Sequence, residues 1–182
     1  MIPEASILAV PVSAHDHTQG NAHAVVTLVE YGDFQCPACG MACPAVKQIQ
    51  RRYAGNLHFV FRHFPLSQAH PYAHMAAELA EAAAVEGQFW AMHDWLYENQ
   101  DGWVANGGAG LEAGVQALGL DKAAIAAALR SPDIDTHIRR DFMGGVRSGV
   151  NGTPSFYVNG ELHQGDFDSL THGVGRLIAR QA

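Results

Sequence analysis

Three cysteines lie within eight residues of one another, at Cys36, Cys39 and Cys43, and the 182-residue chain has no others. Side chains at positions i and i+3 of a helix share a face, with Cβ atoms about 5–6 Å apart. A disulfide needs roughly 3.5–4.5 Å, so a small adjustment lets Cys36 and Cys39 form and break one. Structural disulfides would link distant loops. The clustering therefore indicates local redox or metal chemistry.

The two cysteines of the Cys36-Pro37-Ala38-Cys39 segment are expected to differ in reactivity. Pro37 suits the first position of a helix, where its missing N–H group is not needed. Cys36 then lies at the helix N-terminus, where free N–H groups and the helix dipole stabilise a thiolate. Such a position lowers a cysteine pKa from about 8.5 to roughly 3.5–7.5. We expect Cys36 to attack or be attacked, and Cys39 to resolve the mixed disulfide.

The cysteines could also be buried core residues or metal ligands. Buried apolar cysteines are common in protein cores, but the turn at Gly32-Asp33 immediately before the pair argues against that reading. Alternatively, Cys36, Cys39 and Cys43 could bind a metal or cluster in a non-catalytic module. Structural zinc usually takes four ligands, and the sequence has no second cysteine pair. We therefore expect no metal here and predict that Cys43 is a small core residue.

The remaining pattern predicts an α/β fold whose elements position this pair. Apolar and β-branched runs indicate strands, and Asn159-Gly160 is a strong hairpin signal. Strands are predicted at Val25–Val29, Leu57–Phe61, Ser155–Val158 and Leu162–Gln164, with an edge strand at Ile7–Val12. The cysteine helix should run to about Tyr53, and a closing helix should contain Leu170 and Ile178.

A block of helices interrupts the strands between residues 71 and 150, because apolar residues recur there at helical spacing. The predicted helices are Ala73–Ala84, Phe89–Leu96, Leu111–Leu118, Lys122–Leu129 with Asp121 as N-cap, and Ile134–Val146. These elements divide the chain into an N-terminal extension at 1–23, a core at 24–66 and 150–182, and an inserted helical subdomain at 67–149. His17, in the extension, is given no role.

Four segments besides the cysteine pair carry a family resemblance. They are Glu30–Gln35, Phe61–Leu66, Gly87–Trp90 and Gly152–Pro154. With the pair, they make the chain similar to the DsbA-like oxidoreductases of the thioredoxin superfamily, from about Val25 to the C-terminus. The resemblance implies a thioredoxin fold with an inserted all-helical subdomain. It also implies thiol–disulfide exchange with protein or peptide substrates and a redox partner, without a bound cofactor.

The resemblance also implies roles for residues outside the pair. Pro44 matches the proline that bends the cysteine helix. Thr153 and Pro154 match the cis-proline loop that faces the cysteines, which leaves the main chain of Thr153 free to pair with an extended substrate. Without the resemblance, an ordinary trans-proline would be expected. Glu30 matches an acidic residue that lies beneath Cys39 in the family. Burial there would raise the pKa of Glu30 and suit it to proton transfer with Cys39. Without the resemblance, a glutamate exposed to solvent at the end of a strand is an equal alternative.

One departure from the family pattern concerns the residues between the cysteines. Strongly oxidising periplasmic members have Pro-His there, whereas this chain has Pro37-Ala38. A histidine could stabilise the Cys36 thiolate and Ala38 cannot. The sequence therefore predicts a couple that is less oxidising than the strongest members of the family.

Composition and charge limit the partners. The formal charge is −7, from 18 acidic and 11 basic residues, which disfavours nucleic acid or an anionic membrane surface. No apolar run approaches a membrane span. Because Ile7–Val12 is short and no Lys or Arg precedes Lys47, no signal peptide is expected. A cytoplasmic location is predicted, with a periplasmic or secreted mature form left open.

Two further alternatives follow from the sequence. Related thioredoxin-like folds with helical inserts include glutathione-dependent transferases and isomerases, which typically do not need both cysteines. His70 and His74 have the i, i+4 spacing of a chelating pair. Since no third ligand lies nearby in sequence, we expect them to be surface or first-turn histidines.

Overall fold

A five-stranded sheet in the order β1-β3-β2-β4-β5 forms the centre of the molecule. The structure is a computed structural model and describes residues 7–181. The strands are β1 (His17–Gly20), β2 (Val26–Gly32), β3 (Leu57–His63), β4 (Ser155–Val158) and β5 (Glu161–Leu162). β2 and β3 run parallel, whereas β1, β4 and β5 pair antiparallel with their neighbours.

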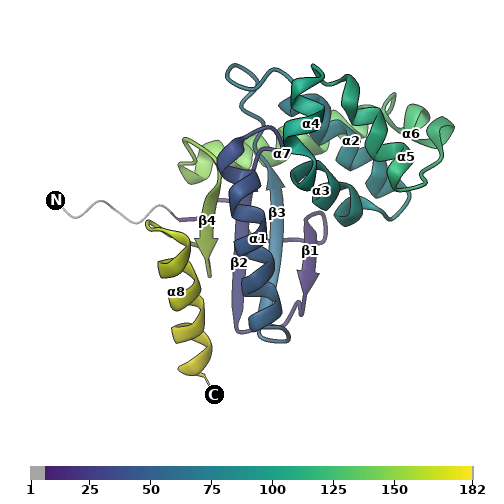
Figure 1. Ribbon diagram of the computed structural model, residues 1–182. Helices are drawn as coiled ribbons and strands as arrows, with labels where there is room; N and C mark the ends of the chain where they lie inside the picture. The colour runs from purple at the N-terminus through teal and green to yellow at the C-terminus, as the bar shows by residue number, and fades with distance from the viewer. Residues whose placement is uncertain (1–6, 182) are drawn as a thin grey trace.

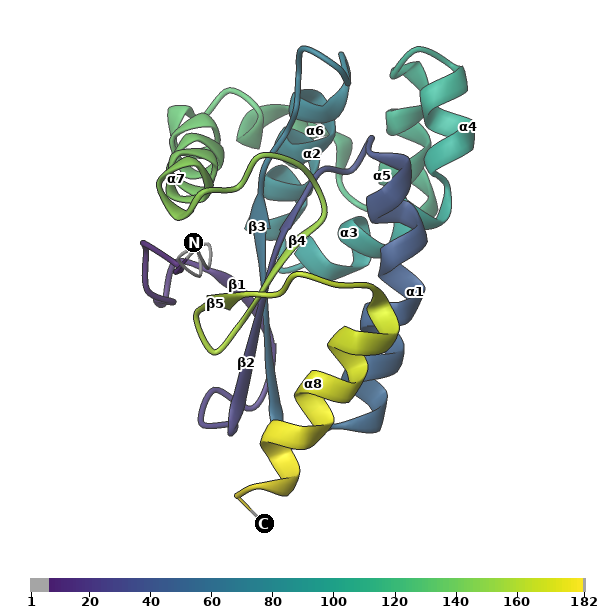
Figure 2. The same ribbon diagram turned by 90° about the vertical axis from the view of Figure 1, so that its left-hand side faces the viewer.

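Helices cover both faces of this sheet. α1 (Pro37–Arg52) and α8 (Phe167–Ala179) lie on one face, and α7 (Pro132–Ser148) lies on the other (Figures 1 and 2). Side chains alternate between the faces of a strand. Leu28 therefore packs in the core with α1, whereas its neighbour Val29 packs in the second core on the opposite face. The same alternation turns Glu30 toward the α1 side.

The helical block lies between β3 and β4, as predicted. Its elements are α2 (Ala73–Val85), α3 (Phe89–Glu98), α4 (Gln100–Ala105), a 3₁₀ turn (Ala109–Leu111), α5 (Glu112–Ala117), α6 (Lys122–Ala128) and α7. Figure 1 shows α2 to α6 grouped beyond the end of α1 that carries the cysteines. Asp121 is the N-cap of α6, as expected, because its carboxylate accepts from two main-chain N–H groups. The sequence did not predict α4, whose six residues include a glycine.

The predicted edge strand at Ile7–Val12 is wrong. Within residues 7–181, this segment forms only an isolated bridge between Ile7 and Glu161, and β1 forms the edge instead. The side chain of Arg62 explains the difference, since it donates to the carbonyls of Val10 and Pro11 at 2.9 and 3.1 Å. Pro11 also lacks the N–H group that a strand ladder uses.

A buried ion pair holds the segment before β1 against the sheet. Arg62 Nε and Nη2 donate to the two carboxylate oxygens of Asp16 at 2.8 and 3.1 Å, and both side chains are 3% exposed. Arg62 Nη1 also donates to the hydroxyl of Tyr31 at 3.0 Å. Such two-point contacts of arginine with carboxylate fix geometry as well as charge. The segment is thereby tied to β2 and β3, the strands that lead to the cysteines.

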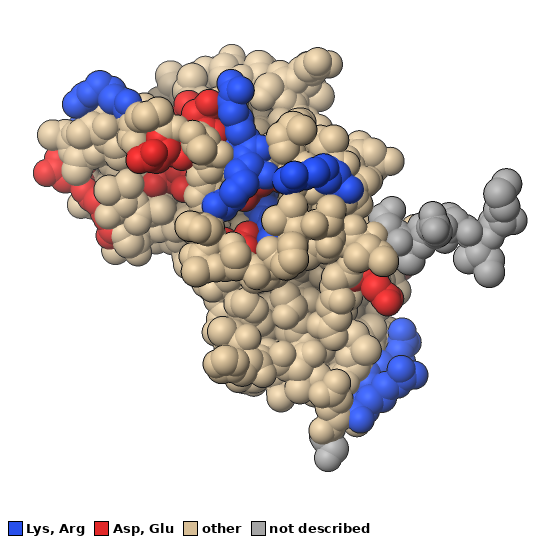
Figure 3. Space-filling model, turned by 180° about the vertical axis from the view of Figure 1, so that it is seen from behind, with Lys and Arg blue, Asp and Glu red and all other residues tan. Residues whose placement is uncertain are grey.

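The surface charges are mixed. Seen from behind, basic side chains gather in the upper part of the molecule with acidic side chains close by, and a second basic group lies at the lower edge, while the surface between them is mostly uncharged (Figure 3). α7 lies on this side and carries the ion pair Arg139–Asp135 at 2.7 Å. Among the helices within residues 7–181, none is long and apolar enough to cross a membrane.

Candidate active site

Cys36 is the N-cap of α1, as the position of Pro37 predicted. Its backbone is extended, with φ −69° and ψ 120°, and its carbonyl accepts from the N–H groups of Cys39 and Gly40 at 3.1 Å each. Cys36 is 6% exposed and Cys39 is fully buried, and both are free thiols. The two sulfurs therefore differ in access, with Cys36 the one nearer solvent.

The acidities of the two cysteines differ strongly. A hydrogen bond from Cys39 lowers the pKa of Cys36 to about 5, against the opposing effect of burial. The N–H groups of Cys39 and Ala38 act in the same direction as the Cys39 hydrogen bond. Burial, followed by the hydrogen bond to Cys36, raises the pKa of Cys39 well above the ordinary cysteine value. At neutral pH, Cys36 is thus a thiolate and Cys39 a thiol.

The loop before Cys36 is fixed by Asp33, whose side chain is buried. Its carboxylate accepts from the N–H groups of Gln35 at 2.8 Å and Leu66 at 2.9 Å. His70 Nδ1 lies 2.7 Å from the same carboxylate. Asp33 therefore forms the turn, as predicted, and also joins it to the segment after β3. His70, expected to be a surface or first-turn histidine, is held at this point.

The loop before β4 faces the cysteines. The Thr153–Pro154 peptide bond is cis, as the family resemblance predicted. As a thiol, Cys36 donates to the main-chain carbonyl of Thr153 at 3.4 Å. Although 117 residues separate them in sequence, Cys36 and this loop are therefore direct neighbours.

Glu30 is buried, which excludes the solvent-exposed alternative. It is 2% exposed, and its Oε1 has no hydrogen-bond partner among residues 7–181. Burial, with a smaller contribution from the charge of Cys36, raises the pKa of Glu30 to about 8. The charge of Glu30 in turn contributes to the raised pKa of Cys39. Glu30 is thus a carboxyl group that can gain or lose a proton near neutral pH beside the buried thiol.

The inserted helices contribute residues that the sequence did not identify. Gln100 Nε2 donates to the carbonyls of Phe34 at 2.6 Å and Cys36 at 3.0 Å. Gly40 permits this approach, because a Cβ there would lie 2.8 Å from Gln100 Oε1. The buried hydroxyl of Tyr97 has no partner among the described residues. Neither Gln100 nor Tyr97 belongs to a recognisable sequence motif, so their position near the cysteines becomes apparent only from the packing of the insert against α1.

Cys43 is buried in the core, as predicted. Burial raises its pKa to about 12. Its sulfur and ligand atoms of His93 and Asp94 all lie within 4.8 Å of one another. Cys43 therefore stays a protonated thiol at neutral pH.

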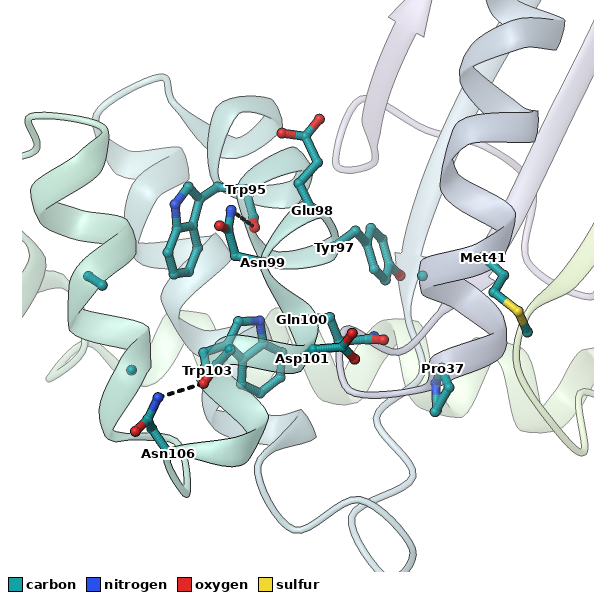
Figure 4. A pocket seen from close by; sticks show the side chains of 14 residues that line it. Pro37, Met41, Trp95, Tyr97, Glu98, Asn99, Gln100, Asp101, Trp103 and Asn106 are labelled. Carbon is teal, nitrogen blue, oxygen red and sulfur yellow. Dashed lines mark hydrogen bonds between the residues drawn. The ribbon is translucent and has the colours of Figure 1, made fainter.

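A cleft of about 680 Å³ opens beside the cysteine end of α1. Figure 4 shows Pro37 and Met41 of α1 on one side, with Trp95, Trp103 and other side chains of α3 and α4 on the other. Met41 is 73% exposed. Glu98 and Asp101 add negative charge to the lining. The cleft thus combines apolar, aromatic and acidic groups beside Pro37, the residue that follows Cys36.

The pKa of Cys36 gives a testable pH dependence. Only the thiolate is nucleophilic, so its alkylation by iodoacetamide should be constant near neutral pH and fall about tenfold per pH unit below about 5. Peptide mass spectrometry would follow the modified cysteine. In Cys39→Ala the midpoint should rise, because the main cause of the low pKa is lost. A wild-type midpoint near the ordinary value of about 8.5 would contradict this assignment.

Sequence comparisons agree with this geometry. A family model described as Thioredoxin matches residues 13–172. Among curated relatives, the Na⁺/H⁺ antiporter NhaA 1 of Salinispora arenicola is 43% identical over 162 residues, covering 88% of this chain and 24% of the relative. NhaA 1 of Mycolicibacterium gilvum is 35% identical over 158 residues, covering 86% and 25%. The chain thus spans about a quarter of the length of the curated relatives it matches.

Solved structures share the whole architecture. A thioredoxin-like oxidoreductase from Silicibacter pomeroyi is 27% identical with a TM-score of 0.77, covering 93% of this chain and 95% of its own. DsbA2 of Pseudomonas aeruginosa is 25% identical with a TM-score of 0.72, covering 92% and 96%. BdbD of Bacillus subtilis, at 21% identity and a TM-score of 0.81, covers 97% and 100% and shows the same fold. The predicted thioredoxin fold with inserted helices is confirmed.

Proposed function

The chain belongs to the thioredoxin family and resembles its DsbA-like members, and on that premise we propose that it is a thiol–disulfide oxidoreductase acting on protein substrates. One observation carries the proposal. A helix N-terminus holds the Cys36 thiolate, with a pKa of about 5, one turn from the buried thiol of Cys39. This is the asymmetric pair that exchange through a mixed disulfide requires.

In the proposed reaction, one disulfide is transferred between this protein and its substrate, so that one of them is oxidised as the other is reduced. In the oxidising direction, a substrate thiolate attacks Cys36 Sγ of the Cys36–Cys39 disulfide, and Cys39 leaves and takes a proton from Glu30. A second substrate thiolate then attacks the substrate sulfur of the mixed disulfide. The substrate gains a disulfide, and Cys36 leaves as a thiolate. A redox partner that carries a disulfide then reoxidises the pair and is itself reduced to a dithiol. The reverse sequence reduces a substrate.

Substrate binding is proposed for the surface that surrounds Cys36. The main chain of Thr153 lies against the Cys36 sulfur and immediately precedes β4, which suits pairing with an extended segment. The cleft between α1 and the insert begins at Pro37 and offers space for side chains of the same substrate. An extended polypeptide could therefore contact both regions at once.

A redox titration tests this proposal. Thioredoxin has a nucleophile pKa of about 7 and a potential of about −270 mV, whereas the corresponding values for DsbA are about 3.5 and about −120 mV. The pKa of Cys36, about 5, lies between them, so equilibration with glutathione buffers should give an intermediate potential. The same preparation should catalyse disulfide exchange in a reduced or oxidised model protein. A pair that never forms a disulfide in these buffers would refute the proposal.

A further inference from the structure

Three histidines converge on the buried carboxylate of Glu81. His17 Nε2 of β1 and His63 Nε2 of β3 lie 2.6 and 2.7 Å from Glu81 Oε1 of α2. His137 Nδ1 of α7 lies 3.4 Å from Glu81 Oε2. The Glu81 side chain is only 7% exposed. Four segments that are distant in sequence thus contribute to one polar cluster.

The spacing of these atoms suits a metal ion. Tetrahedral zinc with ligands at about 2.0–2.1 Å places ligand atoms about 3.3 Å apart. The ligand atoms of His17, Glu81 and His137 all lie within 4.8 Å of one another. The Glu81–His137 separation of 3.4 Å already fits, and the Glu81–His17 separation of 2.6 Å would need to open by less than one ångström.

We propose that His17 Nε2, the Glu81 carboxylate and His137 Nδ1 bind a divalent transition-metal ion, for which zinc is the best match. Two imidazoles with one carboxylate leave a fourth position for water, and imidazole also suits copper and nickel. The side chains of His17 and His137 are 16% and 18% exposed, so an ion can enter from solvent. Binding displaces the protons on the two ligating nitrogens, either to the other ring nitrogen or to solvent.

Neighbouring groups can orient these ligands. His63, which is 1% exposed, donates to Glu81 and would hold its carboxylate. Asp141 Oδ2 lies 3.4 Å from His137 Nε2, the ring nitrogen opposite the proposed ligand atom. A carboxylate in that position fixes the tautomer of a metal-bound histidine. Arg140 Nη2, which lies 3.0 Å from the same nitrogen, would have to turn away, and its side chain is 37% exposed.

The charge balance also favours a cation here. The Glu81 carboxylate is 7% exposed and is contacted only by histidines among the described residues, with no Lys or Arg paired to it. The second described group of potential ligands, formed by Cys43, His93 and Asp94, differs in this respect. There Lys47 Nζ already pairs with Asp94 at 2.7 Å. A bound ion at the first group would connect β1 to α2 and α7, and so clamp the insert to the sheet.

Metal titration with two probes tests the site. Zinc should bind one ion per chain with micromolar or tighter affinity in isothermal titration calorimetry, and should raise the unfolding temperature. Cobalt(II) should give ligand-field bands without a thiolate charge-transfer band. His17→Ala and His137→Ala should each weaken zinc binding more than about 100-fold, and Asp141→Asn about 10–100-fold, as for other groups that orient ligands. Circular dichroism would verify that each variant is folded.

Two histidines outside the cluster provide matched controls. His172 is exposed on α8, and His74 pairs with Glu78 and Asp135 at the surface. His172→Ala and His74→Ala should bind zinc as the wild type does. Absence of one-to-one binding to the wild type would overturn the proposal. So would a thiolate–cobalt band, which would instead place the metal on the cysteines, or unchanged affinity in folded His17→Ala and His137→Ala.

Discussion

Replacing Cys36 by alanine is expected to reduce disulfide exchange to the uncatalysed rate. Cys36 carries the thiolate, with a pKa of about 5, and the only other cysteines are Cys39 and Cys43. Both are buried, and burial is the main cause that raises the pKa of each. Since the thiolate is the attacking species, neither can replace Cys36. The rate of reduction or oxidation of a model protein substrate would measure the loss.

Cys39→Ala is expected to have a different effect from Cys36→Ala. The nucleophile remains, so a substrate disulfide should still be attacked, but the mixed disulfide with Cys36 cannot be resolved. The variant should therefore accumulate as a covalent complex, visible by non-reducing electrophoresis and assigned to Cys36 by mass spectrometry. Double replacement of Cys36 and Cys39 should abolish trapping.

Cys43 provides the matched control for both variants. It is buried among His93 and Asp94 and has a pKa of about 12, so Cys43→Ala should keep exchange within about twofold of the wild type. It should lower stability modestly, as expected when a small core side chain is truncated. Full exchange activity in Cys36→Ala would refute the proposed function. Full activity of Cys39→Ala on a small electrophile with glutathione would support the transferase or isomerase alternative.

The placement of the cysteine pair at a helix start could be predicted from sequence because its signals are local. Four consecutive residues, with Pro37 after Cys36, indicate where the helix begins, and the N-cap geometry of Cys36 confirms that start. Continuous apolar runs similarly indicated β2 and β3, and Asn159-Gly160 indicated the β4–β5 hairpin. The cis bond before Pro154 needed the family resemblance, since no feature of its own residues distinguishes it from a trans bond.

What the sequence did not show depends on contacts between distant residues. No feature of the sequence indicates a role for His17, yet its ring forms a hydrogen bond with Glu81, 64 residues away. Ile7–Val12 has the composition of a strand, but Arg62, about 50 residues on, takes its carbonyls. Gln100 reaches the carbonyl of Cys36 across 64 residues. No periodicity or motif in the sequence indicates these contacts, because they form only when the insert and the sheet pack together.

Glu30→Gln is expected to slow resolution of the mixed disulfide about 100-fold, at the lower end of the range for general base catalysis. In the reducing direction, the Cys39 thiol must lose a proton before it attacks, and burial makes that loss unfavourable. Glu30 is the buried carboxyl group whose charge acts on Cys39. Glutamine has nearly the same shape but cannot accept the proton. Rapid-mixing measurements of substrate release from a preformed mixed disulfide would give the rate.

The pH profile distinguishes this role from a structural one. Glu30 accepts a proton only as a carboxylate, so the wild-type rate should rise with pH through its pKa and then level off. That pKa is about 8 when Cys36 is a thiolate. In the mixed disulfide the Cys36 charge is absent while burial remains, so the inflection should lie below about 8 but above the usual glutamate value of about 4.3. Glu30→Gln should lose the inflection, whereas Glu112→Gln, at an exposed site on α5, should keep both rate and profile. An unchanged rate and inflection in Glu30→Gln would exclude Glu30 as the proton acceptor, because the group that titrates would then still be present in the variant.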